Sequence, residues 1–500
     1  MASRRWLQLA SKGRDAPDKP VLSQHSDHGT GFDTDIDTSS GQELEVIDPQ
    51  AERRLLHKLD AVFVPIIMVV YLSCFLDRTN IGNVKVAGMP EDIKASPAEF
   101  STAISIFYAT YVALETPWSI LLKKLTPRFL LTALCVVWSL TTIFSGFITN
   151  VGGLYAARLV LGACEGGLFP GLNLYLTMVY KREEQAKRVS YLFVCAAISG
   201  AVGGLLAYGL LKMDGVAGQV GWRWVFWIEG VASLVIAPVI WFGLPNDPTN
   251  AYFLNAEEKQ LMRIREKQRA QYMGSEEFSW DELWIALKDL KLWISSGIQF
   301  CQDVLLYGFS TFLPSIITTM GYGALQTQYL TIPVYLVGGV AFLALAYVSD
   351  KLCIRGPFVA FANVFGIVGY ILILCPTSNG VKFFGTFLCA IAVYNGPGLN
   401  LTWLNVNFAP HYRRAMAIGV QQSLANTAGV VAGQIYRTPP YELGNAFSLG
   451  ALGLAQLLIA WKWLYLRRQN VKKQKIESGE MEDTRKVKTG DRELDFRYHL

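Results

Sequence analysis

The sequence has little charge for its length. Only 17% of its 500 residues are Asp, Glu, Lys or Arg, whereas 52% are hydrophobic. A soluble chain of this size would form two or three domains and carry more charge. The apolar residues gather in runs of roughly 20, the length needed to cross about 30 Å of hydrocarbon. The composition therefore excludes an ordinary soluble protein and indicates one that crosses a bilayer many times.

Several kinds of chemistry are also missing. The eight cysteines form no Cys-x-x-Cys pair and have no histidine cluster beside them, so we expect small buried side chains rather than disulfides or metal ligands. No glycine-rich stretch ends in Gly-Lys-Ser or Gly-Lys-Thr, and no nucleophile–base or metal constellation is present. We therefore expect no enzyme, no cofactor, no metal and no nucleic acid, and we expect an ion gradient as the energy source.

The apolar runs predict an all-α membrane protein with twelve spans in two six-helix halves. The expected spans are 60–79, 101–122, 129–148, 151–176, 189–211, 222–243, 291–319, 328–349, 358–376, 381–403, 412–435 and 445–466. The halves are then 60–243 and 291–466, with tails at 1–59 and 467–500. The first tail is polar, lacks a cleavable signal and is typical of a disordered segment.

A polar stretch, 244–290, separates the halves. Asn255 and Glu258 have the spacing of a capping box, which predicts a helix that begins just after Asn255 and lies on the cytoplasmic side.

Orientation follows from the basic residues in the short loops. The loops after the even-numbered spans carry Lys123, Lys124, Arg128, Lys181, Arg182, Lys187, Arg188, Lys351, Arg355, Arg413 and Arg414, and the opposite loops carry fewer. Because basic loops stay inside, we expect both termini to be cytoplasmic.

Six segments, in order along the chain, carry a family resemblance. They are FLDRTNIGN at 75–83, EGGLFPG at 165–171, GWRWVFWIEG at 221–230, YGFSTFLP at 307–314, SDK at 349–351 and QIYR at 434–437. The set resembles the anion:cation symporter family of the major facilitator superfamily, especially its fungal allantoate and nicotinate permeases. No single segment is decisive, but together they run from about residue 60 to 466.

The resemblance includes a gating loop that occurs twice. After the second span, the superfamily has a loop in which acidic and basic residues pair; here Lys123, Lys124 and Arg128 are present without an acidic residue. The counterpart after the eighth span keeps Asp350, Lys351 and Arg355. We therefore expect the cytoplasmic gate to depend on the second loop.

Arg158 and Glu165 lie within the fourth predicted span. Their spacing of two helical turns places them on one face, roughly 10 Å apart along the axis. A guanidinium can bind a carboxylate in a bidentate geometry. A carboxyl group in a partly dry cavity can load and release a proton near neutral pH, because burial disfavours its charged form. We expect Arg158 to bind an anion and Glu165 to carry a proton; the alternative is a static ion pair between helices.

Asp77 and Arg78 are neighbours near the end of the first span, so their side chains point about 100° apart. One interpretation turns Asp77 toward the cavity as a second proton carrier and Arg78 toward the substrate or the fourth helix. The resemblance implies that this pair shares proton and anion binding with the fourth helix. The alternative is a hydrated pair at the outer end of the helix, where Asn80, Asn83 and Lys85 follow.

Other charged residues in the spans have weaker assignments. We expect Glu115, which precedes Pro117, to serve loop and gate contacts, and Glu229 to belong to a Trp-rich interfacial segment. Asp303 could tune substrate choice or proton coupling, or have a structural role in a cavity wall.

Polar and aromatic residues of the second half could complete a pocket: Tyr307, Asn400, Trp403, Gln421, Gln422 and Asn426. Amides inside a membrane commonly join helices, at about 0.6 kcal/mol per hydrogen bond, so we expect that role for most of them. Tyr307 and Asn426 also match family motifs, and we expect them to bind substrate.

Together these features predict a secondary active transporter that moves a small organic anion with protons by alternating access. The resemblance implies a nicotinate-like or allantoate-like carboxylate, and we expect a monomer in the plasma membrane. One alternative is an exporter or exchanger with the same fold. A more remote alternative is a nutrient receptor that does not transport, although the tails are short for signalling.

Overall fold

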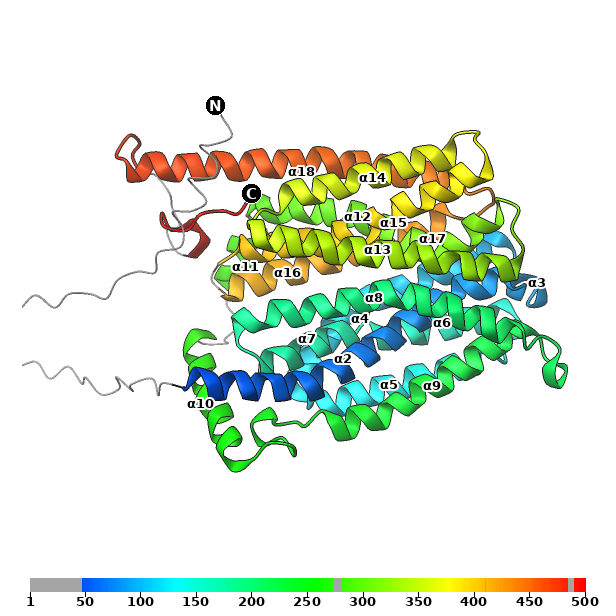
Figure 1. Ribbon diagram of the computed structural model, residues 1–500, viewed down its shortest axis with the longest axis horizontal. Helices are drawn as coiled ribbons and strands as arrows, with labels where there is room; N and C mark the ends of the chain where they lie inside the picture. The colour runs from blue at the N-terminus through cyan, green and yellow to red at the C-terminus, as the bar shows by residue number, and fades with distance from the viewer. Residues whose placement is uncertain (1–46, 274–279, 410, 484–489) are drawn as a thin grey trace, which may run out of the picture. The chain divides into compact units, whose positions relative to one another are not determined.

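The structure, a computed structural model, describes residues 47–273, 280–409, 411–483 and 490–500 (Figure 1). Of the tail 1–59 that was predicted to be disordered, residues 1–46 lie outside this part of the chain. The prediction is wrong for residues 49–59, which belong to a helix. Each of the twelve predicted spans coincides with one helix or with two consecutive helices. The prediction of an all-α membrane protein with two six-helix halves is confirmed.

The first six spans form the N-terminal half. Its helices are α2 (Pro49–Val86), α3 (Met89–Asp92), α4 (Pro97–Lys124), α5 (Pro127–Ser145), α6 (Val151–Glu165), α7 (Leu168–Val179), α8 (Arg182–Leu211) and α9 (Gly221–Gly243), with the 3-10 helix η1 (Val216–Gly218) before α9. The fourth span consists of α6 and α7, separated by Gly166 and Gly167. A Cβ on Gly166 would lie 2.6 Å from the backbone oxygen of Tyr111 in α4, so glycine permits this close approach. Helix α2 begins before residue 60 because Asp48 caps its polar first turn.

The last six spans form the C-terminal half. Its helices are α12 (Leu290–Thr318), α13 (Ala324–Leu352), α14 (Gly356–Leu374), α15 (Asn379–Val406), α16 (His411–Asn426), α17 (Ala428–Ile435) and α18 (Glu442–Glu477). The eleventh span consists of α16 and α17, which meet at Thr427. Helix α18 continues beyond residue 466 through a basic segment that the hydrophobic run does not include.

In the described residues, nine candidate spans are long and apolar enough to cross a membrane by composition alone. Helices α4 and α15 are less apolar and carry buried polar side chains such as Glu115 and Asn400, whereas α16, which carries Gln421, and α17 are each shorter than a full span. Helix α4 packs against α16 and α17 of the other half, and α15 packs against α12 and α13. Other helices therefore surround these polar residues, which is where a membrane protein tolerates them.

The stretch between the halves contains the 3-10 helix η2 (Pro248–Asn250), α10 (Ala256–Met273) and α11 (Trp280–Leu287). The predicted capping box is confirmed: the Glu258 amide donates to Asn255 Oδ1 over 2.7 Å, and the Asn255 amide donates to Glu258 Oε2 over 2.8 Å. Ion pairs from Arg265 to Glu52 and Glu184 hold α10 against the N-terminal half.

The end of the chain packs against the C-terminal half. Asp491, in the 3-10 helix η3 (Gly490–Arg492), is fully buried and forms ion pairs with Lys291 of α12 and Arg413 of α16, the latter at 2.9 Å. The backbone oxygen of Leu500 accepts a hydrogen bond from the Arg355 amide over 2.8 Å. The predicted tail is therefore partly helix and partly a segment that covers the bundle.

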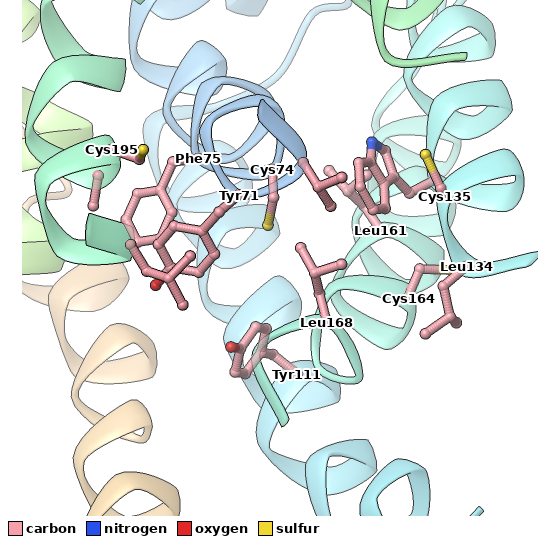
Figure 2. Packing of buried hydrophobic residues seen from close by; sticks show 14 of the residues in the cluster. Tyr71, Cys74, Phe75, Tyr111, Leu134, Cys135, Leu161, Cys164, Leu168 and Cys195 are labelled. Atoms are coloured by element: carbon pink, nitrogen blue, oxygen red, sulfur yellow. The ribbon is translucent and has the colours of Figure 1, made fainter. Parts of the chain in front are cut away.

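Six of the eight cysteines are buried, and Cys353 and Cys375 are exposed. Figure 2 shows Cys74, Cys135 and Cys195 among tyrosine, phenylalanine and leucine side chains. The prediction of small buried side chains is confirmed for the six. It is wrong for the two at the ends of α13 and α14, where each helix gives way to a loop.

The two halves meet closely at one end of the helices. We call the end with Pro49 and Glu477 the tail side and the opposite end the far side. On the far side, Gly82 of α2 lies against Thr311 of α12, and a Cβ on Gly82 would overlap the Thr311 carbonyl group. Only a glycine allows the halves to approach this closely.

Hydrogen bonds also join the halves at the same level. Gln328 Nε2 of α13 donates to the Asn83 carbonyl oxygen over 3.3 Å, and Ser105 Oγ of α4 donates to the Val430 carbonyl oxygen over 2.9 Å. The far side is therefore closed by direct contacts between the halves.

Candidate substrate cavity

A cavity lies between the two halves, on the tail side of these contacts. Its volume is about 50 Å³, which is room for a few water molecules. Its aromatic wall residues are Tyr71, Phe75, Tyr111, Phe169, Tyr307 and Tyr394, and its polar ones are Arg78, Gln299, Asp303, Gln422 and Asn426. Of the predicted site residues, Arg78, Tyr307 and Asn426 line the cavity, whereas Arg158, Glu165 and Asp77 do not.

Arg78 carries the positive charge on the N-terminal wall. Its Nε and Nη2 donate to Glu165 Oε2 over 3.1 and 3.0 Å, and the two side chains are 7% and 0% exposed. The rings of Phe75 and Tyr111 lie 4.7 and 4.9 Å from the guanidinium carbon. The remaining nitrogen, Nη1, donates to no atom of the described chain, so the guanidinium keeps one nitrogen for a ligand.

Glu165 is the last residue of α6, directly before the break in the fourth span. Its Oε2 also accepts from the Cys74 thiol over 3.2 Å, whereas its buried Oε1 has no hydrogen-bond partner in the described part of the chain. Glu165 thus pairs with Arg78 of another helix, and the arrangement leaves one carboxylate oxygen unsatisfied.

Arg158 lies two turns before Glu165 on α6 and is 4% exposed. Its charge interacts with Glu165 and, more weakly, with Asp77. Within the described residues it has neither a hydrogen-bond acceptor nor an ion-pair partner within 4 Å. The predicted role of Arg158 as a substrate ligand stays a prediction, because its side chain is absent from the cavity wall.

Asp77 points away from the cavity. Its Oδ2 accepts hydrogen bonds from Trp138 Nε1 of α5 and Ser233 Oγ of α9, both over 3.0 Å. The expected orientation toward the cavity is not observed, because the angular offset of Asp77 from Arg78 directs its side chain between α5 and α9. Its predicted role as a proton carrier stays a prediction. The hydrated alternative is wrong: Asp77 and Arg78 are 2% and 7% exposed.

Glu229 extends this buried group of carboxylates. It is 4% exposed and accepts a hydrogen bond from Asn80 Nδ2 of α2, and its Oε1 has no partner among the described residues. Its charge also interacts with that of Asp77. The interfacial assignment of Glu229 is therefore wrong: the residue faces inward from a tryptophan-rich helix.

A second set of contacts crosses between the halves at Asn426, the last residue of α16. Tyr307 of α12 donates to Asn426 Oδ1 over 2.6 Å, and Asn426 Nδ2 donates to Glu115 of α4 over 3.1 Å. Glu115, expected to serve loop contacts, is 7% exposed and belongs to this set instead.

Asp303 is an acidic residue on the C-terminal wall, where Gln299 Nε2 donates to it over 3.3 Å. Gln299 in turn accepts from Asn400 over 2.8 Å and from Gln421 over 3.3 Å. These contacts confirm that Asn400 and Gln421 join helices.

Lys462 of α18 is a buried cation that the sequence reasoning missed. It is 1% exposed, donates to Ser295 Oγ over 2.9 Å and to Asn400 Oδ1 over 3.3 Å, and lies 3.8 Å from the centre of the Trp403 ring. A lysine inside the last predicted span was a visible signal under the rule that singled out the other charges.

The second gating loop holds its charges within itself. Arg355 pairs with Asp350 and donates to Ser349 Oγ over 3.0 Å, and its amide contacts the end of the chain at Leu500. The predicted gating role of Asp350, Lys351 and Arg355 stays a prediction.

Two six-helix halves around a cavity lined by polar and aromatic side chains are typical of a membrane transporter with its solute site between repeats. Residues 67–433 match the model of the Major Facilitator Superfamily. The chain belongs to this superfamily. It is a multi-pass membrane transporter and not an enzyme.

Several known proteins are similar to it. A transporter of Schizosaccharomyces pombe that is described as uncharacterized is 46% identical over 469 residues, 93% of this chain and 97% of the relative. The high-affinity nicotinic acid transporter of Saccharomyces cerevisiae is 32% identical over 428 residues, 85% and 80% of the two chains. A D-xylose–proton symporter shares the fold, with a TM-score of 0.61 and 14% identity over 80% of this chain and 96% of its own.

Proposed function

We propose that this transporter is a proton-coupled symporter of a small organic anion, a monomer in the plasma membrane with both termini in the cytoplasm. The observation that supports this most directly is the Arg78–Glu165 ion pair at the cavity wall. An arginine that lines a cavity can bind an anion, and a buried carboxyl group that holds this arginine can regulate its availability.

In the proposed cycle, the proton binds one partner of this ion pair, Glu165, and the substrate binds the other, Arg78. A proton on Glu165 removes the negative charge that holds Nε and Nη2 of Arg78. The guanidinium can then bind a substrate carboxylate in a bidentate geometry, with Tyr307 and Asn426 as further ligands. One proton and one monoanion enter together, so the net charge of the site returns to its starting value. Release of the anion restores the ion pair as the proton leaves.

Arg158 and Asp77 have supporting roles in this proposal. Arg158 places a second positive charge near Glu165, which favours return of the carboxylate form. Asp77, with one unsatisfied oxygen next to this group, is the second proton carrier. The name of the S. cerevisiae relative makes nicotinate the first substrate to test.

The test is uptake into proteoliposomes that contain the purified full-length protein, screened over labelled small carboxylates. We expect a pH gradient, alkaline inside, to drive accumulation of at least one acid, and a protonophore to abolish it. Accumulation that ignores the gradient while acids still exchange across the membrane would instead indicate an exchanger.

Variants separate the roles of the charges. Glu165→Gln imitates the protonated carboxyl group, so we expect exchange of internal for external acid to persist while gradient-driven accumulation is lost. Arg78→Ala should abolish both. Arg158→Ala should abolish binding only if Arg158 is itself the ligand, as the sequence suggests. Glu480→Gln, at an exposed position after α18, is the matched control. Normal gradient-driven uptake in Glu165→Gln would refute the proposal.

A further inference from the structure

Helix α18 is longer than a membrane span. It has 36 residues, which is roughly 54 Å at 1.5 Å per residue, whereas the hydrocarbon core of a bilayer is about 30 Å thick. The predicted apolar run ends at residue 466, but the helix continues to Glu477 and runs past the neighbouring α14 (Figure 1). The last part of α18 therefore lies beyond the hydrocarbon on the tail side.

The exposed face of α18 changes from apolar to basic along its length. One stripe of exposed side chains consists of Leu457, Trp461, Leu464, Arg468, Lys472 and Lys475. These residues recur every three or four positions, so they lie on one face of the helix. The apolar part of the stripe is suited to lipid chains, and the basic part follows it directly on the same face.

The opposite face of the helix extension is covered by the end of the chain. Lys473 Nζ donates to the Phe496 carbonyl oxygen over 2.6 Å, and Asn470 Nδ2 donates to the Tyr498 carbonyl oxygen over 2.8 Å. Among the described residues, no acidic group lies within 4 Å of the three basic residues of the stripe. The stripe is therefore held on the side that faces away from the bundle, with its positive charges not neutralised by ion pairs.

The direction of α18 brings these charges close to the membrane surface. Along the helix, Arg468 lies roughly 3 Å and Lys475 roughly 14 Å beyond residue 466. Side chains on a helix tilt toward its N-terminus, which for this extension is the direction of the membrane. The long stems of lysine and arginine can therefore extend back toward the lipid headgroups. The surface potential also acts outside the headgroups, over a Debye length of about 8 Å.

We propose that Arg468, Lys472 and Lys475 bind the phosphate groups of anionic phospholipids in the leaflet on the tail side. Basic residues that directly follow a span are attracted to such lipids, because their charge lies next to a negatively charged surface. In the proposed orientation this is the cytoplasmic leaflet, in which anionic lipids gather. The proposal concerns a lipid partner and goes beyond the proposed transport function, so it stands for any transported solute.

The test is native mass spectrometry of the purified full-length protein in detergent, with equal concentrations of phosphatidylserine and phosphatidylcholine that have identical acyl chains. The ratio of the two single-lipid adducts measures the preference. We expect phosphatidylserine to be favoured about tenfold or more, since each basic residue near a membrane surface contributes about fivefold to the affinity for anionic lipid. Arg468→Gln combined with Lys472→Gln should remove most of this preference, while an unchanged phosphatidylcholine adduct shows that the variant is folded.

The matched control is Arg263→Gln combined with Lys267→Gln, which removes two exposed positive charges from α10 and should keep the preference. Equal adducts in the wild type, or an unchanged preference in the α18 variant, overturns the proposal. Displacement of the phosphatidylserine adduct by an equal concentration of glycerophosphoserine, the headgroup without acyl chains, also overturns it, because the basic residues would then bind a soluble phosphate.

Discussion

At the scale of single residues, three buried carboxylates in the N-terminal half share an unusual feature. Asp77, Glu165 and Glu229 each have one oxygen with a hydrogen-bond partner and one buried oxygen that has none in the described chain. An ion pair that only joins helices would be expected to satisfy its atoms, because an unpaired buried polar atom costs about 1–3 kcal/mol. An unsatisfied carboxylate oxygen is a place where a proton can bind. This favours a proton-carrying role for the group over a static one.

Gly82 allows a prediction about closure of the far side. Because a Cβ there would overlap the Thr311 carbonyl group, Gly82→Ala should oppose approach of the halves. Overpacking costs about 1–3 kcal/mol, so the ratio of closed to open molecules should fall about 5- to 150-fold. The reporter is Ser101→Cys, a fully buried position on the far side of α4, with the exposed Cys353 and Cys375 changed to serine. Its reaction with a maleimide in detergent should become faster.

The control for this prediction is Gly209→Ala in α8, where nothing lies within 4 Å of the added Cβ. It should leave the labelling rate unchanged. Equal labelling in Gly82→Ala and Gly209→Ala would show that the contact at Gly82 does not limit closure.

At the scale of helices, the breaks in the spans coincide with the site. Glu165 is the last residue before the break between α6 and α7, and Asn426 is the last before the break between α16 and α17. Irregular backbone at membrane depth is tolerated where it lines a cavity, and interrupted helices often form transporter sites. The two breaks therefore present one residue from each half to the central region, where Glu165 contacts Arg78 and Asn426 contacts Tyr307.

The C-terminal segment supplies a prediction at the same scale. Asp491→Ala removes the carboxylate that pairs with Lys291 and Arg413, so it should release the segment from α12 and α16. Loss of one partner of a buried pair costs about 3–5 kcal/mol, and we expect the lower value because Asp289 still lies 3.5 Å from Lys291. The midpoint of thermal unfolding in detergent should fall, whereas Asp495→Ala should leave it unchanged. Equal midpoints would mean that the segment does not stabilise the bundle.

At the scale of the whole molecule, the hydrophobic runs were sufficient to predict twelve spans, because their length is fixed by the bilayer. Arg78 and Tyr307, which belong to the resemblance segments, line one cavity together with Asn426, and their role as substrate ligands stays a prediction. Contacts between helices could not be predicted from the sequence. The spacing of Arg158 and Glu165 suggested a common face of one helix, but Glu165 forms its ion pair with Arg78 of α2. Lys462 and Gln299 belong to a hydrogen-bond network formed by side chains of several helices, and their local sequence does not show which residues they contact.

Lys85 affects the equilibrium between the closed and the open far side of the whole molecule. Lys85 of α2 inserts on the far side among aromatic rings, 4.6 Å from Phe312, 5.0 Å from Tyr441 and 5.8 Å from Phe100, and its buried Nζ has no hydrogen-bond partner in the described chain. Each cation–π contact contributes about 0.5–2 kcal/mol, whereas removing an ammonium group from water costs several kcal/mol. Burial of Lys85 therefore opposes closure of the far side, because its ammonium group regains water when the far side opens.

Lys85→Met should stabilise the closed far side, so labelling of the Ser101→Cys reporter should slow by about tenfold, and uptake should slow with it. Lys212→Met, an exposed far-side lysine over the Tyr208 ring, should change neither rate. Faster labelling in Lys85→Met would mean that the aromatic contacts outweigh desolvation and that Lys85 holds the far side shut.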